Sequence, residues 1–251
     1  MNTIPLPPET LQLYTGPSTG EGFLVGGKHW INIFVDRGFL NTDYKVLDIG
    51  CGSGKTARFM TDKIDSSSGG EFHGLDIHDP CIQWCKDNIG KMHSNFIFKH
   101  ADVRNPYYNA EGSIKPDEFT FPYDNDYFDF SYSTSLFTHM TKQSVEHYLG
   151  EIFRVCKSGG THFSTFFCFE KDVSKIEKSK HLYPKKLFKH DDVSYVMYPD
   201  NPCAFIAYPN SFLEKLITDA GFKVEGIIDP DDGWQAGWIL KKLGGDNAGT
   251  A

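Results

Sequence analysis

The chain has 251 residues, a formal net charge of −8 and a hydrophobic fraction of 39%. This length and composition suit one globular α/β domain with short additions, and they exclude a largely disordered chain. A protein that binds mainly nucleic acid usually carries a basic face, because contacts with phosphates dominate its affinity. The acidic balance and the lack of a dense Lys/Arg cluster therefore argue against nucleic acid as the main partner.

Cysteine usage and hydropathy indicate the compartment. None of the six cysteines forms a paired C-x-x-C motif. No stretch reaches the roughly 18 consecutive apolar residues of a membrane span, and the first residues do not resemble a secretory leader. We therefore expect a cytoplasmic protein with reduced thiols and no membrane contact. We also expect no metal site, because the adjacent residues 190–192 (His-Asp-Asp) cannot readily point at one ion. The sequence does not indicate an oligomeric state.

The first 43 residues are expected to form a lead-in to the main domain. Prolines make residues 1–20 irregular, and an apolar stretch predicts a helix over residues 22–39. Strands and helices then alternate. We predict a strand over 45–49, a helix over 54–64, a strand over 72–77, a helix over 79–90 capped by Asp79, and a strand over 95–101.

The same alternation continues through the main domain, which spans residues 44–243. A polar connection over 104–126 leads to a strand over 127–134, a helix over 142–157 ended by Gly159 and Gly160, and a strand over 162–169. An irregular insertion (170–208) follows, then a helix that Ser211 and Glu214 open as a capping box. Strands over 224–228 and 237–240 precede a flexible tail, residues 244–251. This order predicts a mostly parallel sheet with helices on both faces.

A glycine-rich loop follows the first predicted strand. Residues 46–54 read VLDIGCGSG, so Gly50, Gly52 and Gly54 lie between a buried strand and a helix start. Glycines let the backbone approach a ligand, and a helix start presents unpaired N–H donors. The spacing fits neither a Walker A loop nor the G-x-G-x-x-G dinucleotide fingerprint. We therefore predict a cofactor loop of another kind.

Acidic residues follow the next two predicted strands. Asp76 ends the second strand, where its carboxylate can accept hydrogen bonds from both hydroxyls of an adenosine ribose while Ile77 packs on the adenine. The alternative is an acid that caps the following helix. Asp102 and Val103 end the third strand and are expected to contact the adenine, although an Asp at this place is also an ordinary turn residue.

These motifs, taken in order, resemble those of class I S-adenosylmethionine (SAM)-dependent methyltransferases. The similarity covers roughly residues 40–168 and extends to the closing strands. It implies a Rossmann-like, seven-stranded, mostly parallel sheet with one antiparallel strand and an insertion after strand 5. It also implies that the glycine loop, with Cys51 inside it and Asp48 nearby, holds the methionine part of SAM. The backbone near Ser133 is expected to help, and S-adenosylhomocysteine is the expected product.

The acceptor side of the site is less defined by the sequence. His139 follows the fourth strand in the run SLFTHM, and a histidine can act as general base toward a hydroxyl acceptor. The alternative is a histidine that fixes the start of the next helix. The run resembles bacterial stand-alone methyltransferases linked with sugar modification, which favours a small, sugar-like acceptor. Aromatic residues of the insertion are expected to cover it, namely Tyr183, Tyr195, Tyr198, Phe205 and Tyr208.

Two other functions remain open at this point. One is methylation of a protein or an RNA, against which the acidic charge counts in the case of RNA. The other is a SAM-binding protein without catalysis, which the intact loop and both acids disfavour.

Overall fold

The computed structural model describes residues 4–16, 18–179, 185–229 and 235–244. The chain divides into two compact units. Unit 1 comprises residues 1–102 and 128–131, and unit 2 comprises residues 103–127 and 132–251. Strand β4 (Phe128–Ser133) therefore gives its first four residues to unit 1 and its last two to unit 2.

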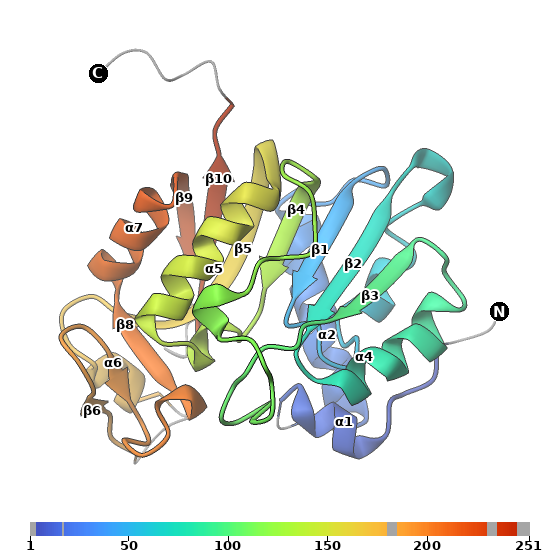
Figure 1. The fold of residues 1–251 in the computed structure, drawn as a ribbon. Helices are drawn as coiled ribbons and strands as arrows, with labels where there is room; N and C mark the ends of the chain where they lie inside the picture. The colour runs from blue at the N-terminus through green and yellow to red at the C-terminus, as the bar shows by residue number, and fades with distance from the viewer. Residues whose placement is uncertain (1–3, 17, 180–184, 230–234, 245–251) are drawn as a thin grey trace. The chain divides into compact units, whose positions relative to one another are not determined.

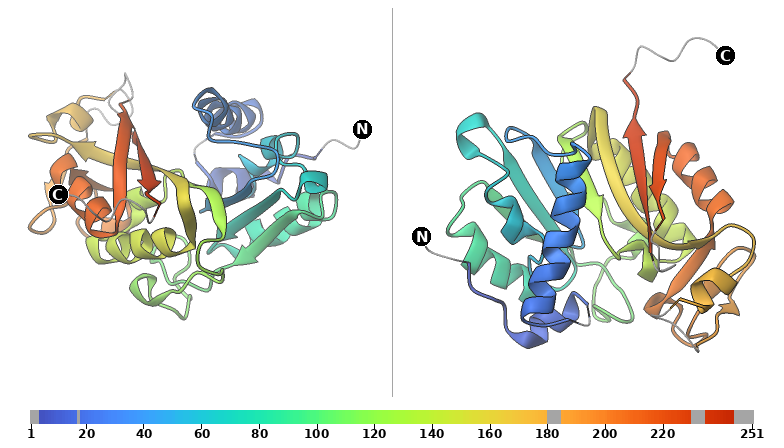
Figure 2. Two further views of the ribbon diagram at one scale, coloured as in Figure 1. Left: turned by 90° about the horizontal axis from the view of Figure 1, so that it is seen from above. Right: turned by 180° about the vertical axis from the view of Figure 1, so that it is seen from behind.

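Unit 1 is built on a sheet with the strand order β3-β2-β1-β4. β1 (Lys45–Ile49) pairs in parallel with β2 (Glu71–Asp76), which pairs in parallel with β3 (Phe96–His100). Helix α2 (Glu21–Asp36) covers one face of this sheet and α4 (Asp79–Cys85) covers the other (Figures 1 and 2). The last four residues of β1 are buried, as expected of a strand covered on both faces.

Three helical predictions for unit 1 need correction. A short helix, α1 (Glu9–Tyr14), lies in the stretch predicted to be irregular. α3 (Ala57–Met60) is a single turn, because the loop before it is left-handed and the Thr61 hydroxyl donates to the Arg58 carbonyl, which competes with further helix. His78, not Asp79, occupies the N-cap of α4, and a π-turn over Lys86–Gly90 continues that helix.

Unit 2 contains the reversed final strand that the resemblance implies. β10 (Ala236–Lys242) pairs antiparallel with β5 (Cys156–Phe169) and with β9 (Phe222–Ile228). Helices α5 (Lys142–Val155) and α7 (Asn210–Asp219) lie side by side against these strands (Figure 1).

Two boundaries in unit 2 differ from the prediction. The backbone becomes extended at Cys156, so β5 begins directly after α5 and includes Gly159 and Gly160. The capping box of α7 is absent, because Pro209 is the N-cap and Ser211 already lies inside the first turn.

The insertion over 170–208 is more regular than predicted. It holds α6 (Ser174–Glu177), β6 (Phe188–Lys189), β7 (Tyr195–Val196), a 3-10 turn (Pro202–Ala204) and the start of β8 (Ile206–Pro209). β8 pairs in parallel with β5. β7 pairs antiparallel with β8, and β6 pairs antiparallel with β7. The described residues thus contain ten strands, not seven. Strands of two residues are too short to show a periodicity in sequence.

The insertion has a small hydrophobic core of its own. Phe205 stacks on Phe167 at a centroid distance of 3.9 Å, and Tyr208 is 1% exposed and donates from its hydroxyl to the Met140 carbonyl. These two aromatic residues are therefore core residues, not the walls of an acceptor pocket as predicted. Tyr183 lies outside the described residues, as does most of the predicted tail (245–251).

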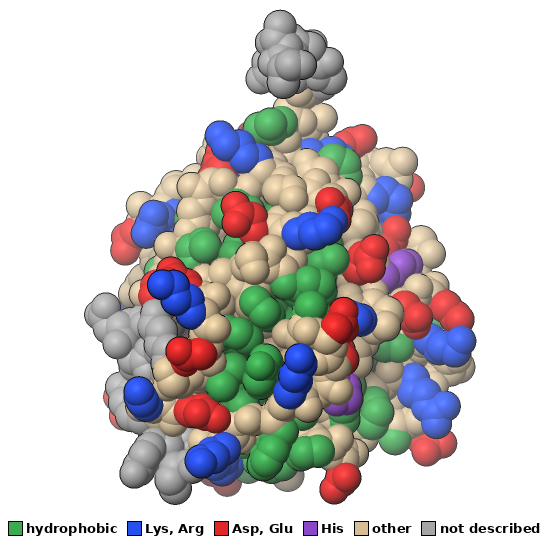
Figure 3. Space-filling view, turned by 90° about the vertical axis from the view of Figure 1, so that its left-hand side faces the viewer, with side chains coloured by type: hydrophobic (Ala, Val, Ile, Leu, Met, Phe, Trp, Pro, Cys, Tyr) green, Lys and Arg blue, Asp and Glu red, His purple; other side chains and the backbone are tan. Residues whose placement is uncertain are grey.

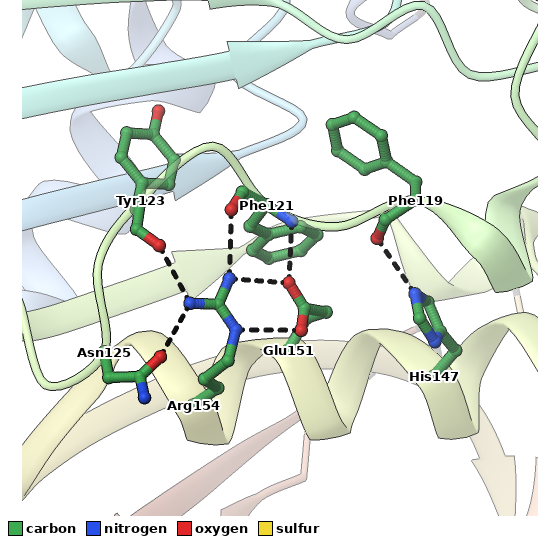
Figure 4. A network of polar contacts seen from close by, with 7 residues as sticks. All are labelled: Phe119, Phe121, Tyr123, Asn125, His147, Glu151 and Arg154. Atoms are coloured by element: carbon green, nitrogen blue, oxygen red, sulfur yellow. Dashed lines mark hydrogen bonds and ion pairs between the residues drawn. The ribbon is translucent and has the colours of Figure 1, made fainter.

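A polar network fastens the segment before β4 to helix α5 (Figure 4). Arg154 forms a two-pronged pair with Glu151 and donates to the carbonyls of Phe121 and Tyr123. Glu151 in turn accepts the Phe121 N–H at 2.6 Å. Burial would raise the pKa of Glu151, but the bonds from Arg154 and Phe121 outweigh it and lower that pKa.

We expect Arg154→Ala to lower the free energy of unfolding by roughly 2–3 kcal/mol, because it removes charged hydrogen bonds and leaves Glu151 and two carbonyls without this donor. Urea denaturation followed by circular dichroism measures the change. Arg104→Ala, at an exposed position of the same unit, is the control and should change stability by less than about 0.5 kcal/mol. Equal values for the two variants would contradict a structural role for the network.

The surface of unit 2 that carries α7 mixes charges of both signs. In Figure 3, Lys and Arg alternate with Asp and Glu around a group of hydrophobic side chains, so this face presents no basic stripe. None of the helices in the described part of the chain is long and apolar enough to cross a membrane.

Candidate active site

The glycine loop follows β1 in unit 1 and has a left-handed backbone at each glycine. The φ angles are 83° at Gly50, 50° at Gly52 and 73° at Gly54. A Cβ atom on Gly52 would lie 2.1 Å from the Thr15 methyl carbon, and one on Gly54 would lie 2.7 Å from the Ile89 side chain. Both conformation and space thus require glycine here, which explains the alternating pattern in the sequence.

Asp76 lies at the end of β2 and is 8% exposed. Its Oδ2 accepts the Gly52 N–H at 2.7 Å, and its Oδ1 accepts the His78 N–H at 2.8 Å. Burial raises the pKa of Asp76, and these backbone bonds counteract the rise. The structure therefore joins the predicted carboxylate directly to the predicted loop.

The donor and acceptor set of unit 1 fits the adenosine and methionine parts of SAM. A carboxylate has about four lone-pair sites, so Asp76 retains acceptor capacity beyond the two backbone bonds. Its position after β2, beside a glycine loop that lacks Cβ atoms, suits a ribose with two vicinal hydroxyls. Ile77 is half-buried next to it, and Asp102 is exposed after β3.

Two other predicted cofactor residues have structural partners within unit 1. Asp48, buried in β1, accepts the Thr56 hydroxyl at 3.1 Å and so fixes the chain after the loop. Cys51 is 4% exposed, and burial raises the pKa of its thiol well above the ordinary value. Cys51 is therefore a neutral packing residue, and its contribution to a ligand would come from its backbone.

Contacts between the N-terminal segment and the glycine loop were not predicted. Ser53 donates to the Leu11 carbonyl at 3.0 Å, and the Lys55 ammonium donates to the Thr15 carbonyl at 2.7 Å. Tyr14 stacks on His78, two residues beyond Asp76, at a centroid distance of 3.6 Å. The only signal in the sequence was Lys55 itself, a cation next to the third glycine. Burial lowers the pKa of the Lys55 ammonium group.

Three predicted site residues belong to unit 2. Val103 is buried and its carbonyl accepts from the Asn109 side chain at 3.0 Å. Ser133 is fully buried, and its hydroxyl lies 3.1 Å from that of Ser164. Any contact of these two residues with a ligand would therefore involve the backbone.

His139 ends a 3-10 turn (Phe137–His139) and is held by both ring nitrogens. Nδ1 lies 2.8 Å from the Cys203 carbonyl, and Nε2 lies 3.1 Å from the Tyr108 hydroxyl. Burial lowers the pKa of His139, and the bond to Cys203 opposes this only in part. The imidazole is thus suited to be neutral near pH 7. Tyr108 was missed at the sequence level, where it stood only as part of a polar connection.

A family model described as a methyltransferase domain matches residues 46–160. The match begins in β1, includes the glycine loop, Asp76 and Asp102, and ends inside β5. Residues 46–160 are thus similar to a methyltransferase domain.

Two curated relatives are similar to part of this chain. Sterol 24-C-methyltransferase of Schizosaccharomyces pombe is 28% identical over 151 residues, which are 60% of this chain and 32% of the relative. Phosphoethanolamine N-methyltransferase 1 of Arabidopsis thaliana is 25% identical over 177 residues, 70% of this chain and 32% of the relative. The chain thus spans about a third of the length of these relatives.

The fold of the chain also has solved counterparts. The crystal structure of a SAM-dependent methyltransferase from Aquifex aeolicus aligns with a TM-score of 0.58 and 14% identity, over 95% of this chain and 100% of the other. At this identity the likeness concerns the fold alone.

Proposed function

We propose that the protein transfers a methyl group from SAM to a small-molecule acceptor and releases S-adenosylhomocysteine. The observation that carries this proposal is the buried Asp76 carboxylate, bonded to the backbone of the glycine loop at the end of β2. Bound SAM supplies a methyl group on a positively charged sulfur. The protein's own contribution is to bind, to orient and to manage the acceptor's proton.

Each predicted cofactor residue has a role in this proposal. The backbone of Gly50, Cys51, Gly52 and Gly54 receives the methionine part, and Asp48 fixes the loop. Asp76 accepts from the ribose hydroxyls and Ile77 packs on the adenine. Asp102 accepts from the adenine, and the Val103 N–H and the backbone at Ser133 are cofactor contacts that the resemblance implies. Six free cysteines agree with a cytoplasmic location.

The acceptor is proposed to be a small molecule with a hydroxyl group, sugar-like in character. The names of both curated relatives specify small acceptors, a sterol and phosphoethanolamine, which supports the size class. The second of these names makes an amine the alternative acceptor. A hydroxyl must lose a proton on methylation, and the neutral His139 offers a base for it.

The test of this proposal is calorimetric titration with SAM and with S-adenosylhomocysteine. We expect wild-type protein to bind both, and Asp76→Asn to bind them about 10–100-fold more weakly, because a charged hydrogen bond contributes about 1.5–3 kcal/mol. Asp79→Asn makes the same change three residues away at an exposed position and should bind like wild type.

Two outcomes would contradict the proposal in different ways. No binding by the wild-type protein would contradict SAM as the cofactor. Binding without any transfer of labelled methyl to sugars, nucleotide sugars or phosphoethanolamine would favour a SAM-binding protein without catalysis.

A further inference from the structure

Both nitrogens of the His139 ring are engaged by protein groups in unit 2. A backbone carbonyl can only accept, so Nδ1, 2.8 Å from the Cys203 oxygen, must carry a hydrogen. In the neutral ring Nε2 is then the acceptor, and the Tyr108 hydroxyl, 3.1 Å away, donates to it. An acceptor molecule therefore meets no free lone pair on His139.

Tyr108 is held in place by a tight turn. The side-chain oxygen of Asn105 accepts the backbone N–H groups of Tyr107 and Tyr108 at 2.9 and 3.0 Å. Asn105 and Asn109 also exchange two backbone hydrogen bonds, each of 2.9 Å. The turn thus fixes the phenol from one side of the imidazole, while the Cys203 carbonyl fixes the ring from the other side.

Tyr108 is half-buried and the neighbouring Tyr107 is 58% exposed, so the turn lies at the surface of unit 2. A phenol whose proton is already shared with a neutral imidazole can accept another proton at its oxygen as it gives up its own. A neutral imidazole, whose conjugate acid has an ordinary pKa of about 6.5, is a far stronger base than the oxygen of a neutral phenol. The net proton therefore comes to rest on the imidazole.

We propose that Tyr108 is the catalytic residue that contacts the acceptor hydroxyl and that His139 is a positioning residue that receives the proton through it. This inference rests on the proposed function. The acceptor oxygen gives its proton to the Tyr108 oxygen as it takes the methyl group, and the Tyr108 proton passes to His139 Nε2. Tyr108 ends neutral, the positive charge formerly on the sulfonium ends on the imidazolium, and solvent later removes that proton.

The first test is the state of the His139 ring in protein labelled with ¹⁵N-histidine, measured by NMR without SAM or acceptor. His139→Gln identifies the His139 signals. We expect the Nδ1–H tautomer in wild type. Tyr108→Phe should shift the Nε2 signal and raise the His139 pKa, because a donor to the neutral ring is lost. Tyr107→Phe removes a hydroxyl from the neighbouring exposed tyrosine and should change neither the Nε2 signal nor the pKa of His139.

The second test measures whether Tyr108 is activated. N-acetylimidazole acylates accessible phenols, and mass spectrometry locates the acetyl group. We expect Tyr108 to react faster than the more exposed Tyr107 in wild type, and this preference to be lost in His139→Gln.

An Nε2–H tautomer in wild type, or equal effects of Tyr108→Phe and Tyr107→Phe on the ring, would overturn the proposal. So would an unchanged Tyr108 reactivity in His139→Gln. These readouts need no cofactor, so they are distinct from a failure to bind SAM, which would contradict the proposed function itself.

Discussion

Gly52→Ala is expected to weaken SAM binding by at least about 100-fold, or about 2.7 kcal/mol. The φ of 50° is unfavourable for alanine, and the new Cβ would lie 2.1 Å from the Thr15 methyl carbon. Either the loop or the N-terminal segment must move, and a shift of the loop breaks the bond from the Gly52 N–H to Asp76. Calorimetry with SAM measures the effect on binding.

The same variant should lose roughly 2–5 kcal/mol of stability, as the sum of about 1–2 for the left-handed backbone and about 1–3 for overpacking. Gly38→Ala is the control, because Gly38 has a φ of 68° and open space where a Cβ would go. Gly38→Ala should lose only the stability of about 1–2 kcal/mol that comes from the left-handed backbone. Adding Thr15→Ser to Gly52→Ala removes the clashing methyl and should restore part of the loss. A Gly52→Ala protein that behaves like Gly38→Ala would contradict the close contact.

His139→Gln is expected to lower kcat by roughly 10²–10⁴-fold, the usual contribution of general acid–base catalysis, while SAM affinity stays unchanged. Tyr108→Phe should lower kcat to a similar degree, because both residues act on one proton. The measurement is transfer of labelled methyl from SAM to the best acceptor found among sugars, nucleotide sugars and phosphoethanolamine. Full turnover by His139→Gln would assign this histidine to fixing the 3-10 turn.

The pH profile gives an independent check on His139. Burial lowers the pKa of this imidazole, so the neutral, proton-accepting form persists below the ordinary histidine pKa. We therefore expect turnover to stay level as the pH falls through about 6.5 and to decline only below it. A decline that begins well above that value would mean that another group controls the acid limb.

The strand predictions were correct where a buried strand produces a clear run of apolar residues in the sequence. β1 was predicted with its observed bounds, because a short apolar run stops at a glycine. The insertion was predicted, but its strands β6 and β7 were missed, since they have only two residues each and gain their stability by pairing with other strands. The early start of β5 was also missed, because Gly159 and Gly160 normally end a helix.

Within the site, residues with a fixed spacing were easier to predict than residues that meet through the fold. The glycines and Asp76 follow consecutive strands, so parallel pairing brings them together. Tyr108 and His139 are 31 residues apart, and no spacing rule relates a polar turn to a residue after the next strand. Thr15 and Gly52 likewise meet only because α1 packs back onto the loop.

The N-terminal segment contacts the loop in a way that tolerates sequence change. Ser53, Lys55 and Arg58 all donate to main-chain carbonyls, at Leu11, Thr15 and Ile4. A carbonyl is the same whichever side chain the residue carries, so substitution at Leu11 or Ile4 preserves the acceptor. Shortening the chain removes it and leaves partly buried donors unpaired. An expression tag at this end should therefore be appended to the full segment and never replace part of it.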